Sequence, residues 1–264
     1  KLGVTLVPIG KKTGILGKIE KTINLLKIAL KHKALNKFDL VEIHYPPHNF
    51  QAYIINIMMQ LMGTKSFVMF WGSDILSITH SDAHKLEKIL SEATFINKPS
   101  EHVYKVFSNF YGNKYNMHFT PKPLRFGTLA LPYIKSVLDS MSKDECKQLY
   151  GIEKNKYSIA IGYNGKRRQQ HISVLNVLSR LDQSVKNKLY LILHLVGIED
   201  DEYRNDILEH VRKSEIEYKI IDSSLDFEQI SKMRVATDIF IHAQTTDGLS
   251  GSIREALYSE AILI

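Results

Sequence analysis

The sequence predicts an α/β protein with two parallel-sheet domains. Apolar strand-like runs alternate with segments of helical periodicity along most of the 264 residues, and strands separated by helices of about 10–15 residues indicate βαβ units. The pattern restarts at residue 157, after a charged segment over 140–156 that has no strand patterning. We therefore predict two Rossmann-like domains, at 1–150 and 151–264.

The first domain is predicted from short apolar, often β-branched runs and from apolar residues at helical spacing. Its predicted strands are 4–9, 38–44, 66–71 and 93–97. Helical periodicity follows each strand, and Ser100 is a good N-cap for the helix after the last of them. The predicted helices are the segment up to residue 35, then 51–62, 81–91, 100–110 and 133–150.

The second domain has the clearer pattern, because its strands are continuous apolar runs, as expected of a sheet covered on both faces. The chain begins at Lys1 without a Met and ends in a strand, so we expect a chain truncated at one or both ends. The predicted strands are 157–162, 188–196, 217–222, 238–242 and 261–264. The predicted helices are 172–182, 201–213, 226–235 and 251–258.

Composition excludes several classes of protein. Hydrophobic residues make up 44% and charged residues 24%, which is typical of globular domains and not of disordered chains. The longest nearly apolar run, 52–62, is interrupted by Asn56 and Gln60 and is shorter than the roughly 20 residues of a membrane span. Cys146 is the single cysteine, which excludes an internal disulfide and favours a reducing, cytoplasmic compartment.

The charge is unevenly distributed. Lys and Arg number 35 and Asp and Glu 28, a net charge of +7. Residues 1–150 hold 20 basic and 11 acidic groups, a net of +9, whereas residues 151–264 hold 15 and 17, a net of −2. The first domain is therefore the one that we expect to meet an anionic partner.

Much of this excess lies in residues 11–37, which contain eight lysines and one acid, Glu20. Apolar residues recur there at helical spacing and predict a basic amphipathic helix. The plainer interpretation is a core-packed helix with a solvated lysine face. The sharper one is contact with an anionic membrane surface, worth about 1 kcal/mol per Lys. No nucleic-acid partner is expected, because no helix-turn-helix, zinc-finger or ribonucleoprotein aromatic signature occurs.

The loop after strand 157–162 is a candidate phosphate site. In open parallel sheets, ligands bind at the carboxyl ends of the strands. Glycines allow close backbone approach, and a helix N-terminus with neighbouring cations favours an anion. The loop matches neither a Walker P-loop nor a dinucleotide fingerprint, and a solvated turn with surface cations is an equal alternative. The candidate residues are Gly162, Asn164, Gly165, Lys166, Arg167 and Arg168.

The loop after strand 238–242 offers two acids around an amide-rich turn. Asp247 lies in the loop and Glu255 lies one turn into the next helix. Ser250 is a plausible N-cap, so the backbone amides of 249–252 would face a ligand above the sheet. Gly248, Leu249 and Ser250 are therefore candidate donor-binding residues. Taken alone, the loop favours a plain structural role, with Asp247 capping a turn and Glu255 on the surface.

Two residues of the first domain complete the candidate catalytic set of Asp247, Asp74 and His44. Asp74 ends the loop Trp71-Gly72-Ser73-Asp74 and is a candidate base or hydrogen-bond acceptor for a sugar. His44 ends the preceding strand. The alternatives are a turn-forming Gly-Ser-Asp and a structural histidine.

Together these segments resemble the GT-B class of glycosyltransferases, and glycosyltransferase family 4 most closely. The strongest match is the segment 236–264 with its two acids Asp247 and Glu255, which is similar to the family's donor-site segment except that the first acid is usually Glu. The string Gly-Tyr-Asn-Gly with His171 is similar to bacterial fucosamine-type transferases. Phe67 to Leu76 resembles a segment of bacterial polysaccharide transferases, and residues 2–9 look like the family's second strand.

The resemblance implies a retaining, metal-independent, hexosyltransferase-type enzyme of bacterial surface polysaccharide synthesis. Its donor would be a nucleotide-diphosphate sugar, with no further cofactor, and its acceptor a glycan or lipid-linked sugar at the inner membrane face. By resemblance, Asp247 would contact the donor sugar and Glu255 the ribose hydroxyls. Lys166 with Arg167 or Arg168 would bind the diphosphate. The first domain would bind the acceptor and the second the donor.

Two other classes stay open. A nucleotide-sugar epimerase or a phosphorylase would have the same architecture, and an epimerase would need no acceptor. A non-catalytic nucleotide-sugar-binding module is the second alternative. The acidic run Glu199-Asp200-Asp201 is interpreted as the favourable charge of a helix start rather than a metal site.

Overall fold

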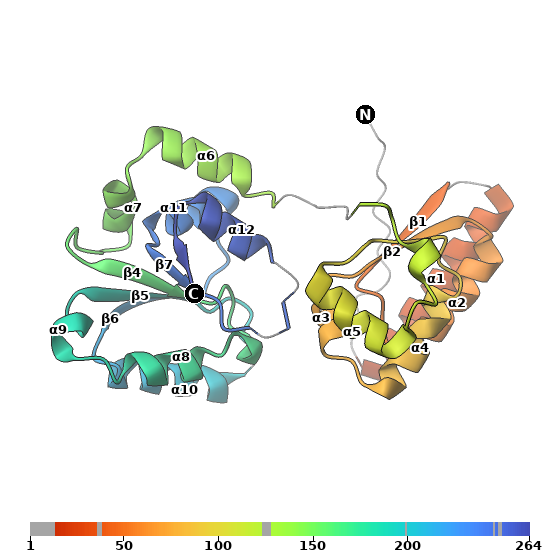
Figure 1. The fold of residues 1–264 in the computed structure, drawn as a ribbon, viewed down its shortest axis with the longest axis horizontal. Helices are drawn as coiled ribbons and strands as arrows, with labels where there is room; N and C mark the ends of the chain where they lie inside the picture. Colours follow the sequence, from red (N-terminus) through yellow and green to blue (C-terminus); the bar gives the residue numbers. More distant parts are fainter. Residues whose placement is uncertain (1–13, 36–38, 123–127, 199, 245, 248–249) are drawn as a thin grey trace. The chain divides into compact units, whose positions relative to one another are not determined.

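A computed structural model describes the protein as two compact units, Lys1–Arg125 and Phe126–Ile264 (Figure 1). The strand predicted at 4–9 lies outside the described part of the chain. The described residues are 14–35, 39–122, 128–198, 200–244, 246–247 and 250–264.

The first unit has a three-stranded parallel sheet in the order β1-β2-β3. Helices connect the strands, as predicted, and the core lies between sheet and helices around Val68, Ile96 and Phe107. The strands are β1 (Leu40–His44), β2 (Lys65–Met69) and β3 (Phe95–Ile96). The helices are α1 (Gly14–Leu35), α2 (Phe50–Met62), α3 (Ser73–Leu76), α4 (His80–Leu90) and α5 (Glu101–Tyr111), with a short 3-10 helix at Asn116–His118.

Local sequence explains several helix ends in this unit. The Asn49 side chain accepts a hydrogen bond from the Gln51 amide and begins α2, which ends at Gly63 in the left-handed region. Thr79 and Asp82 form a reciprocal capping box at the start of α4. Among the described helices, none is both long and apolar enough to cross a membrane.

The second unit has a five-stranded parallel sheet in the order β6-β5-β4-β7-β8. All five strands predicted for this region are present, as β4 (Tyr157–Ile161), β5 (Leu189–His194), β6 (Glu217–Ile221), β7 (Ile239–Ile241) and β8 (Ile262–Leu263). Counted within the unit, the order is 3-2-1-4-5, which is the order of a doubly wound Rossmann-like sheet. The strands β5 and β6 are added on one side of β4, and β7 and β8 on the other, so the order of strand addition reverses between β4 and β7.

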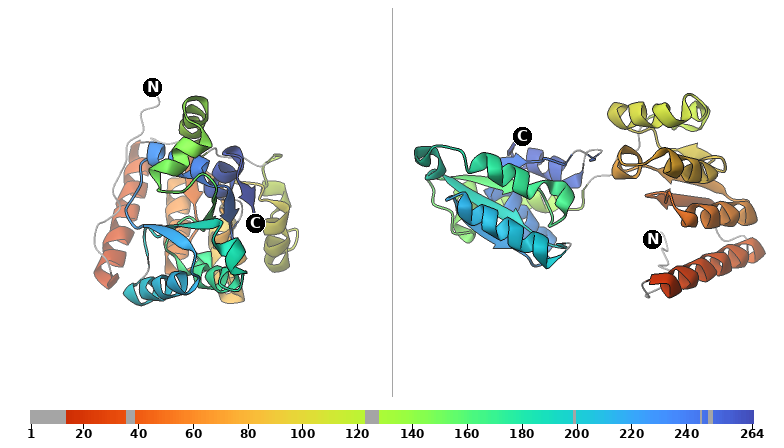
Figure 2. Two further views of the ribbon diagram at one scale, coloured as in Figure 1. Left: turned by 90° about the vertical axis from the view of Figure 1, so that its left-hand side faces the viewer. Right: turned by 90° about the horizontal axis from the view of Figure 1, so that it is seen from below.

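Helices cover both faces of this sheet (Figures 1 and 2). Leu175, Ile207 and Val211 pack α8 (His171–Leu178) and α10 (Asp201–Lys213) against one face. Met233 and Ile253 pack α11 (Phe227–Ala236) and α12 (Gly251–Tyr258) against the other. Every residue of β5 is buried, which confirms the two-sided burial predicted from the continuous apolar runs. The short α9 (Gln183–Lys186) leads into β5.

The predicted domain boundary at residue 150 differs from the structure, which places α6 (Leu131–Ser140) and α7 (Lys143–Leu149) in the second unit. Ile134, Val137 and Cys146 pack with α11 residues in one buried cluster. The single helix predicted at 133–150 is broken at Met141, because the Ser142 hydroxyl and the Glu145 carboxylate form a capping box that starts α7.

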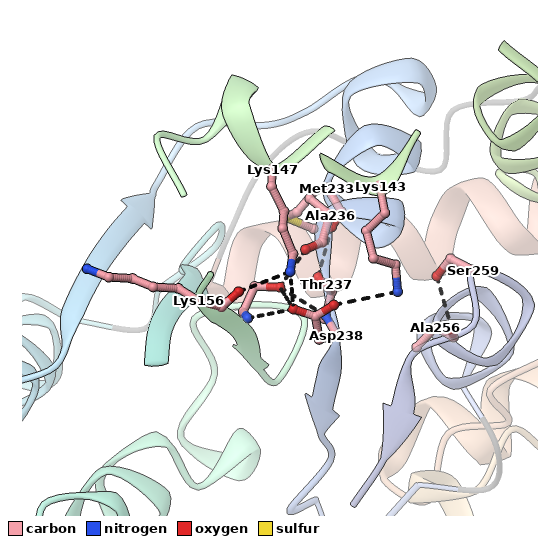
Figure 3. Close-up of polar contacts among 10 residues, drawn as sticks. Lys143, Lys147, Lys156, Met233, Ala236, Thr237, Asp238, Ala256 and Ser259 are labelled. Carbon is pink, nitrogen blue, oxygen red and sulfur yellow. Dashed lines mark hydrogen bonds and ion pairs between the residues drawn. The ribbon is translucent and has the colours of Figure 1, made fainter. Parts of the chain in front are cut away.

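A buried ion pair fixes α7 to the amino edge of the second sheet (Figure 3). Lys147 Nζ lies 2.6 Å from Asp238 Oδ2, and the Lys147 side chain is only 6% exposed. Asp238 also accepts a hydrogen bond from the Ser158 amide at 2.8 Å, and Lys143 lies 3.7 Å away. Lys147 donates a second hydrogen bond to the Lys156 carbonyl at 3.0 Å. The network therefore joins α7 to the first residues of β4 and to the residue before β7.

We predict that Lys147→Met lowers the free energy of unfolding by roughly 3 kcal/mol, because it leaves the Asp238 carboxylate with incomplete compensation. Lys143 and Ser158 keep the loss at the lower end of the range for broken buried pairs. The matched control is Lys154→Met, which removes an exposed pair with Asp144 and should change stability by less than about 1 kcal/mol. Urea unfolding followed by circular dichroism measures both, and equal effects would contradict the structural role of the buried pair.

Candidate functional site

The candidate site lies where β4 and β7 run side by side in the second sheet. Ile159, Ala160 and Ile161 pair in parallel with Ile239, Phe240 and Ile241. The loops that follow these strands therefore leave the same edge of the sheet, as expected for the two candidate loops of a parallel sheet. In doubly wound sheets, this reversal point is where ligands bind.

Backbone geometry explains the glycines of the first loop. Gly162 adopts a φ of +64° and donates a hydrogen bond to the Ile241 carbonyl at 3.0 Å. A Cβ added at Gly165 would lie 2.6 Å from the Leu195 carbonyl oxygen, which only glycine avoids. The Asn164 side chain accepts a hydrogen bond from the Lys166 amide and closes a local turn. These three residues shape the loop.

The three consecutive cations of the loop have different surroundings. The Arg167 guanidinium binds both oxygens of Asp200, at 2.9 and 3.0 Å, and lies 4.5 Å from the centre of the Tyr203 ring. Asp200 also caps α10 through the Tyr203 amide, in agreement with its interpretation as a helix-start acid. Within the described ranges, no carboxylate forms an ion pair with Lys166 or Arg168. These two cations carry the uncompensated charge.

Two buried polar residues lie where this loop enters α8. Gln169 is fully buried and donates a hydrogen bond from Nε2 to Gln244 Oε1 at 2.7 Å, which ties the two loops together. His171 is also fully buried, with Nδ1 at 3.1 Å from the Tyr203 hydroxyl. Burial lowers the pKa of His171 to about 4, so its imidazole is neutral at pH 7.

In the second loop, Asp247 lies against a buried histidine. Asp247 Oδ2 is 3.2 Å from His242 Nε2, and the two side chains are 7% and 9% exposed. The Tyr163 ring, from the first loop, stacks parallel to the His242 ring at 6.0 Å. Burial, followed by the Asp247 charge, raises the pKa of Tyr163. The structure therefore joins Asp247 to both loops.

Glu255 is buried rather than on the surface, which excludes the plainer interpretation of that residue. Its Oε2 lies 3.2 Å from Nε of Arg234, a residue that is 3% exposed. The Arg234 guanidinium lies 5.2 Å from the centre of the Phe240 ring. Ser250 occupies the N-cap of α12 as predicted, but its hydroxyl makes no capping bond. The predicted site residues Gly248 and Leu249 lie outside the described residues.

The first unit gives Asp74 a local structural role. Asp74 is buried and accepts hydrogen bonds from the amides of Trp71 and Gly72 at 3.0 and 2.8 Å. These bonds close the turn after β2, which corresponds to the plainer alternative. Burial raises the pKa of Asp74 against the effect of these hydrogen bonds, which lower it.

His44, the other predicted residue of this unit, lies beside an aromatic pair. His44 Nε2 is 3.2 Å from Glu42, and its ring centre is 5.8 Å from that of Trp71. The exposed Tyr45 stacks on Trp71 at 5.4 Å with an interplanar angle of 11°. This aromatic surface lies at the carboxyl edge of the first sheet.

Several buried polar atoms of the second unit lack a hydrogen-bond partner within the part of the chain that the structure describes, and they gather at its carboxyl edge. Buried polar groups nearly always have partners, so this concentration marks a position for a polar ligand or water. His242, Gln169 and Gln244 were not among the predicted site residues, although each ends or follows a predicted strand. Among the atoms are Gln169 Oε1, His171 Nε2, His194 Nε2, both ring nitrogens of His242 and Ser250 Oγ.

No protein-family model matches the chain, and no curated protein sequence matches it. Solved structures do. HepE from Anabaena, crystallised with UDP and glucose, has a TM-score of 0.67 at 15% identity over 97% of this chain. OtsA, in an apo structure, has a TM-score of 0.65 at 11% identity over 96% of this chain. A UDP-forming α,α-trehalose-phosphate synthase from Burkholderia xenovorans has a TM-score of 0.65 at 8% identity over 92%.

The fold is that of the GT-B glycosyltransferases. This confirms the predicted α/β fold class. The chain spans 64% of the length of HepE and of OtsA.

Proposed function

We propose that this protein is a retaining glycosyltransferase that transfers a sugar from a nucleotide-diphosphate donor bound by the second unit. The observation that carries the proposal is that two loops meet at the β4–β7 edge. The loop after β4 carries the uncompensated cations Lys166 and Arg168. The loop after β7 carries Asp247, and Glu255 lies in the helix that follows it. The complex of the structurally similar HepE with UDP-glucose supports it. The spacing of Asp247 and Glu255 supports family 4 as the nearest relatives within this fold class.

In the proposed reaction, an acceptor hydroxyl oxygen bonds to the anomeric carbon while the bond from that carbon to the phosphate oxygen breaks. The acceptor proton passes to the leaving diphosphate, and attack from the same face gives retention. Negative charge grows on the diphosphate. In this proposal Lys166, Arg168 and the first amides of α8 stabilise that charge electrostatically. Arg167 is already neutralised by Asp200, so we assign the diphosphate to its two neighbours. These cations make a metal unnecessary.

The two acids would bind the neutral parts of the donor. Glu255 uses Oε2 for Arg234, while its Oε1 lies nearer the start of α12, beside Gly251. A carboxylate held in this way accepts hydrogen bonds from ribose hydroxyls. Asp247 would accept hydrogen bonds from the hydroxyls of the donor sugar. Carboxylate acceptors are stronger than neutral ones, which suits a site that must orient a polar ligand.

Calorimetry with UDP, GDP, dTDP and CMP tests this proposal. We expect one nucleotide to bind saturably, unaffected by EDTA. Lys166→Ala and Arg168→Ala should each weaken it roughly 10-fold to 100-fold, as expected for the loss of a charge-assisted contact, and Arg167→Ala should weaken it less. The control is Lys188→Ala, an exposed lysine before β5 at the opposite edge. Absence of nucleotide binding, or equal loss in the control, would contradict the proposal.

We further propose that the first unit binds the acceptor and docks on an anionic membrane, where a lipid-linked acceptor would be found. The stacked Tyr45 and Trp71 rings beside His44 offer a surface for a sugar ring. In α1, the exposed residues Ile23, Lys27, Leu30 and Lys31 are spaced to share one helix face. Apolar side chains between lysines suit the boundary of an anionic bilayer.

Vesicle sedimentation tests the membrane contact. Each lysine near an anionic surface contributes about 1 kcal/mol, so Lys27→Gln with Lys31→Gln should weaken binding to phosphatidylglycerol vesicles roughly 30-fold. The matched control replaces Lys105 and Lys122, two exposed lysines elsewhere in the same unit. Normal binding by the α1 variant, or an equal loss in the control, would remove the basis of this proposal.

A further inference from the structure

We propose that His242 is a positioning residue that holds Asp247 in the orientation needed to bind the donor sugar. This inference rests on the proposed function and adds a residue to it. His242 Nε2 lies 3.2 Å from Asp247 Oδ2. Both side chains are more than nine-tenths buried, so the contact is shielded from water.

The imidazole has a rigid support, whereas Asp247 lies in a loop. The His242 amide donates a hydrogen bond to the Ile264 carbonyl at 2.8 Å, so its backbone continues the pairing of β7 with β8. The ring lies 6.0 Å from the Tyr163 ring and 6.1 Å from the Phe240 ring. A ring held in this way can fix the orientation of the carboxylate that it contacts.

A second set of contacts connects the His242–Asp247 pair to the loop after β4. Gln244 Oε1 accepts hydrogen bonds from the Tyr163 hydroxyl at 3.3 Å and from Gln169 Nε2 at 2.7 Å. Tyr163 therefore links the His242–Asp247 pair to the loop that carries Lys166 and Arg168. We infer that the distance between the sugar end and the diphosphate end of the donor site is set by this buried layer of side chains.

The hydrogen bonding of the His242 ring supports the assignment. Both ring nitrogens are buried and have no hydrogen-bond partner among the described residues, although Nε2 lies within ion-pair distance of Asp247. A buried ring nitrogen without a partner is unusual unless a ligand or water completes it. A sugar hydroxyl held by Asp247 would be close enough to this layer for the same ring to contribute to its recognition.

The consequence is a selective effect on the sugar part of the donor. Lys166 and Arg168 bind the diphosphate without using His242. Loss of the imidazole should therefore weaken binding of a nucleotide sugar and leave binding of the bare nucleotide diphosphate unchanged. A merely structural histidine would weaken both ligands together.

The test compares each of UDP, GDP and dTDP with its glucose conjugate by calorimetry. For the pair that the wild-type protein binds, we expect His242→Ala to raise the ratio of the conjugate's Kd to the diphosphate's Kd about tenfold, and the diphosphate's Kd to change less than about twofold. His242→Gln, which places an amide near the position of Nε2, should restore most of the ratio, whereas His242→Asn should not. Adding Asp247→Ala to His242→Ala should cause little further loss, since coupled residues are not additive.

The control is His210→Ala in α10, which removes a partly buried histidine that bonds only the Asp206 carbonyl among the described contacts. It should leave the ratio unchanged. If His242→Ala weakens both ligands equally, or weakens neither, the inference is overturned while the proposed donor site stands. If the wild-type protein binds no nucleotide, the proposed function fails and the inference fails with it.

Discussion

The parallel pairing of β4 with β7 is the constraint on which the second unit depends. Ser158 and Asp238, which bond to each other across this pair, are 80 positions apart in the sequence. The chain builds β5 and β6 on one side of β4 before it returns to place β7 and β8 on the other. Because of this reversal, two loops that are distant in the sequence leave the sheet together, and the cations of one loop share this edge with the acids Asp247 and Glu255.

The two edges of this strand pair differ in whether their buried polar groups have hydrogen-bond partners. At the amino edge, Asp238 is satisfied by Lys147, Lys143 and Ser158, so the cost of burying its charge is compensated. At the carboxyl edge, buried oxygen and nitrogen atoms of Gln169, His242 and Ser250 lack hydrogen-bond partners within the described chain. Unsatisfied groups of this kind cost stability, and proteins keep them chiefly at functional sites. The stable edge holds the strands while the other edge remains available to a ligand.

Much of this fold could be predicted from the sequence, because apolar runs and helical spacing record burial directly. The β5 run, buried along its whole length, is the clearest example. The break at Met141 was missed because both flanking helices have helical periodicity, although the Ser142–Glu145 capping box was visible in the sequence. The glycines of the first loop were also predictable, since close backbone packing leaves few alternatives to Gly162 and Gly165.

Partnerships between distant residues could not be predicted. Arg167 and Asp200 are 33 positions apart, so the neutralisation of one cation among three was not visible. The same holds for Arg234 with Glu255, which are 21 positions apart. His242 and Asp247 are close in sequence, but the sequence does not show that both side chains are buried against each other. Asp74 shows the opposite situation, because its carboxylate bonds to the backbone of its own turn, an alternative that the local sequence already offered.

Hydrogen exchange with and without saturating nucleotide diphosphate tests the central claim most directly, because it reports on both edges of the sheet at once. With nucleotide diphosphate bound, we expect slower amide hydrogen exchange in peptides covering 160–171 and 246–255. Exchange over 143–158, at the amino edge, should not change. Protection confined to the amino edge or to the first unit, or no protection at any concentration, would contradict a donor site at the β4–β7 edge.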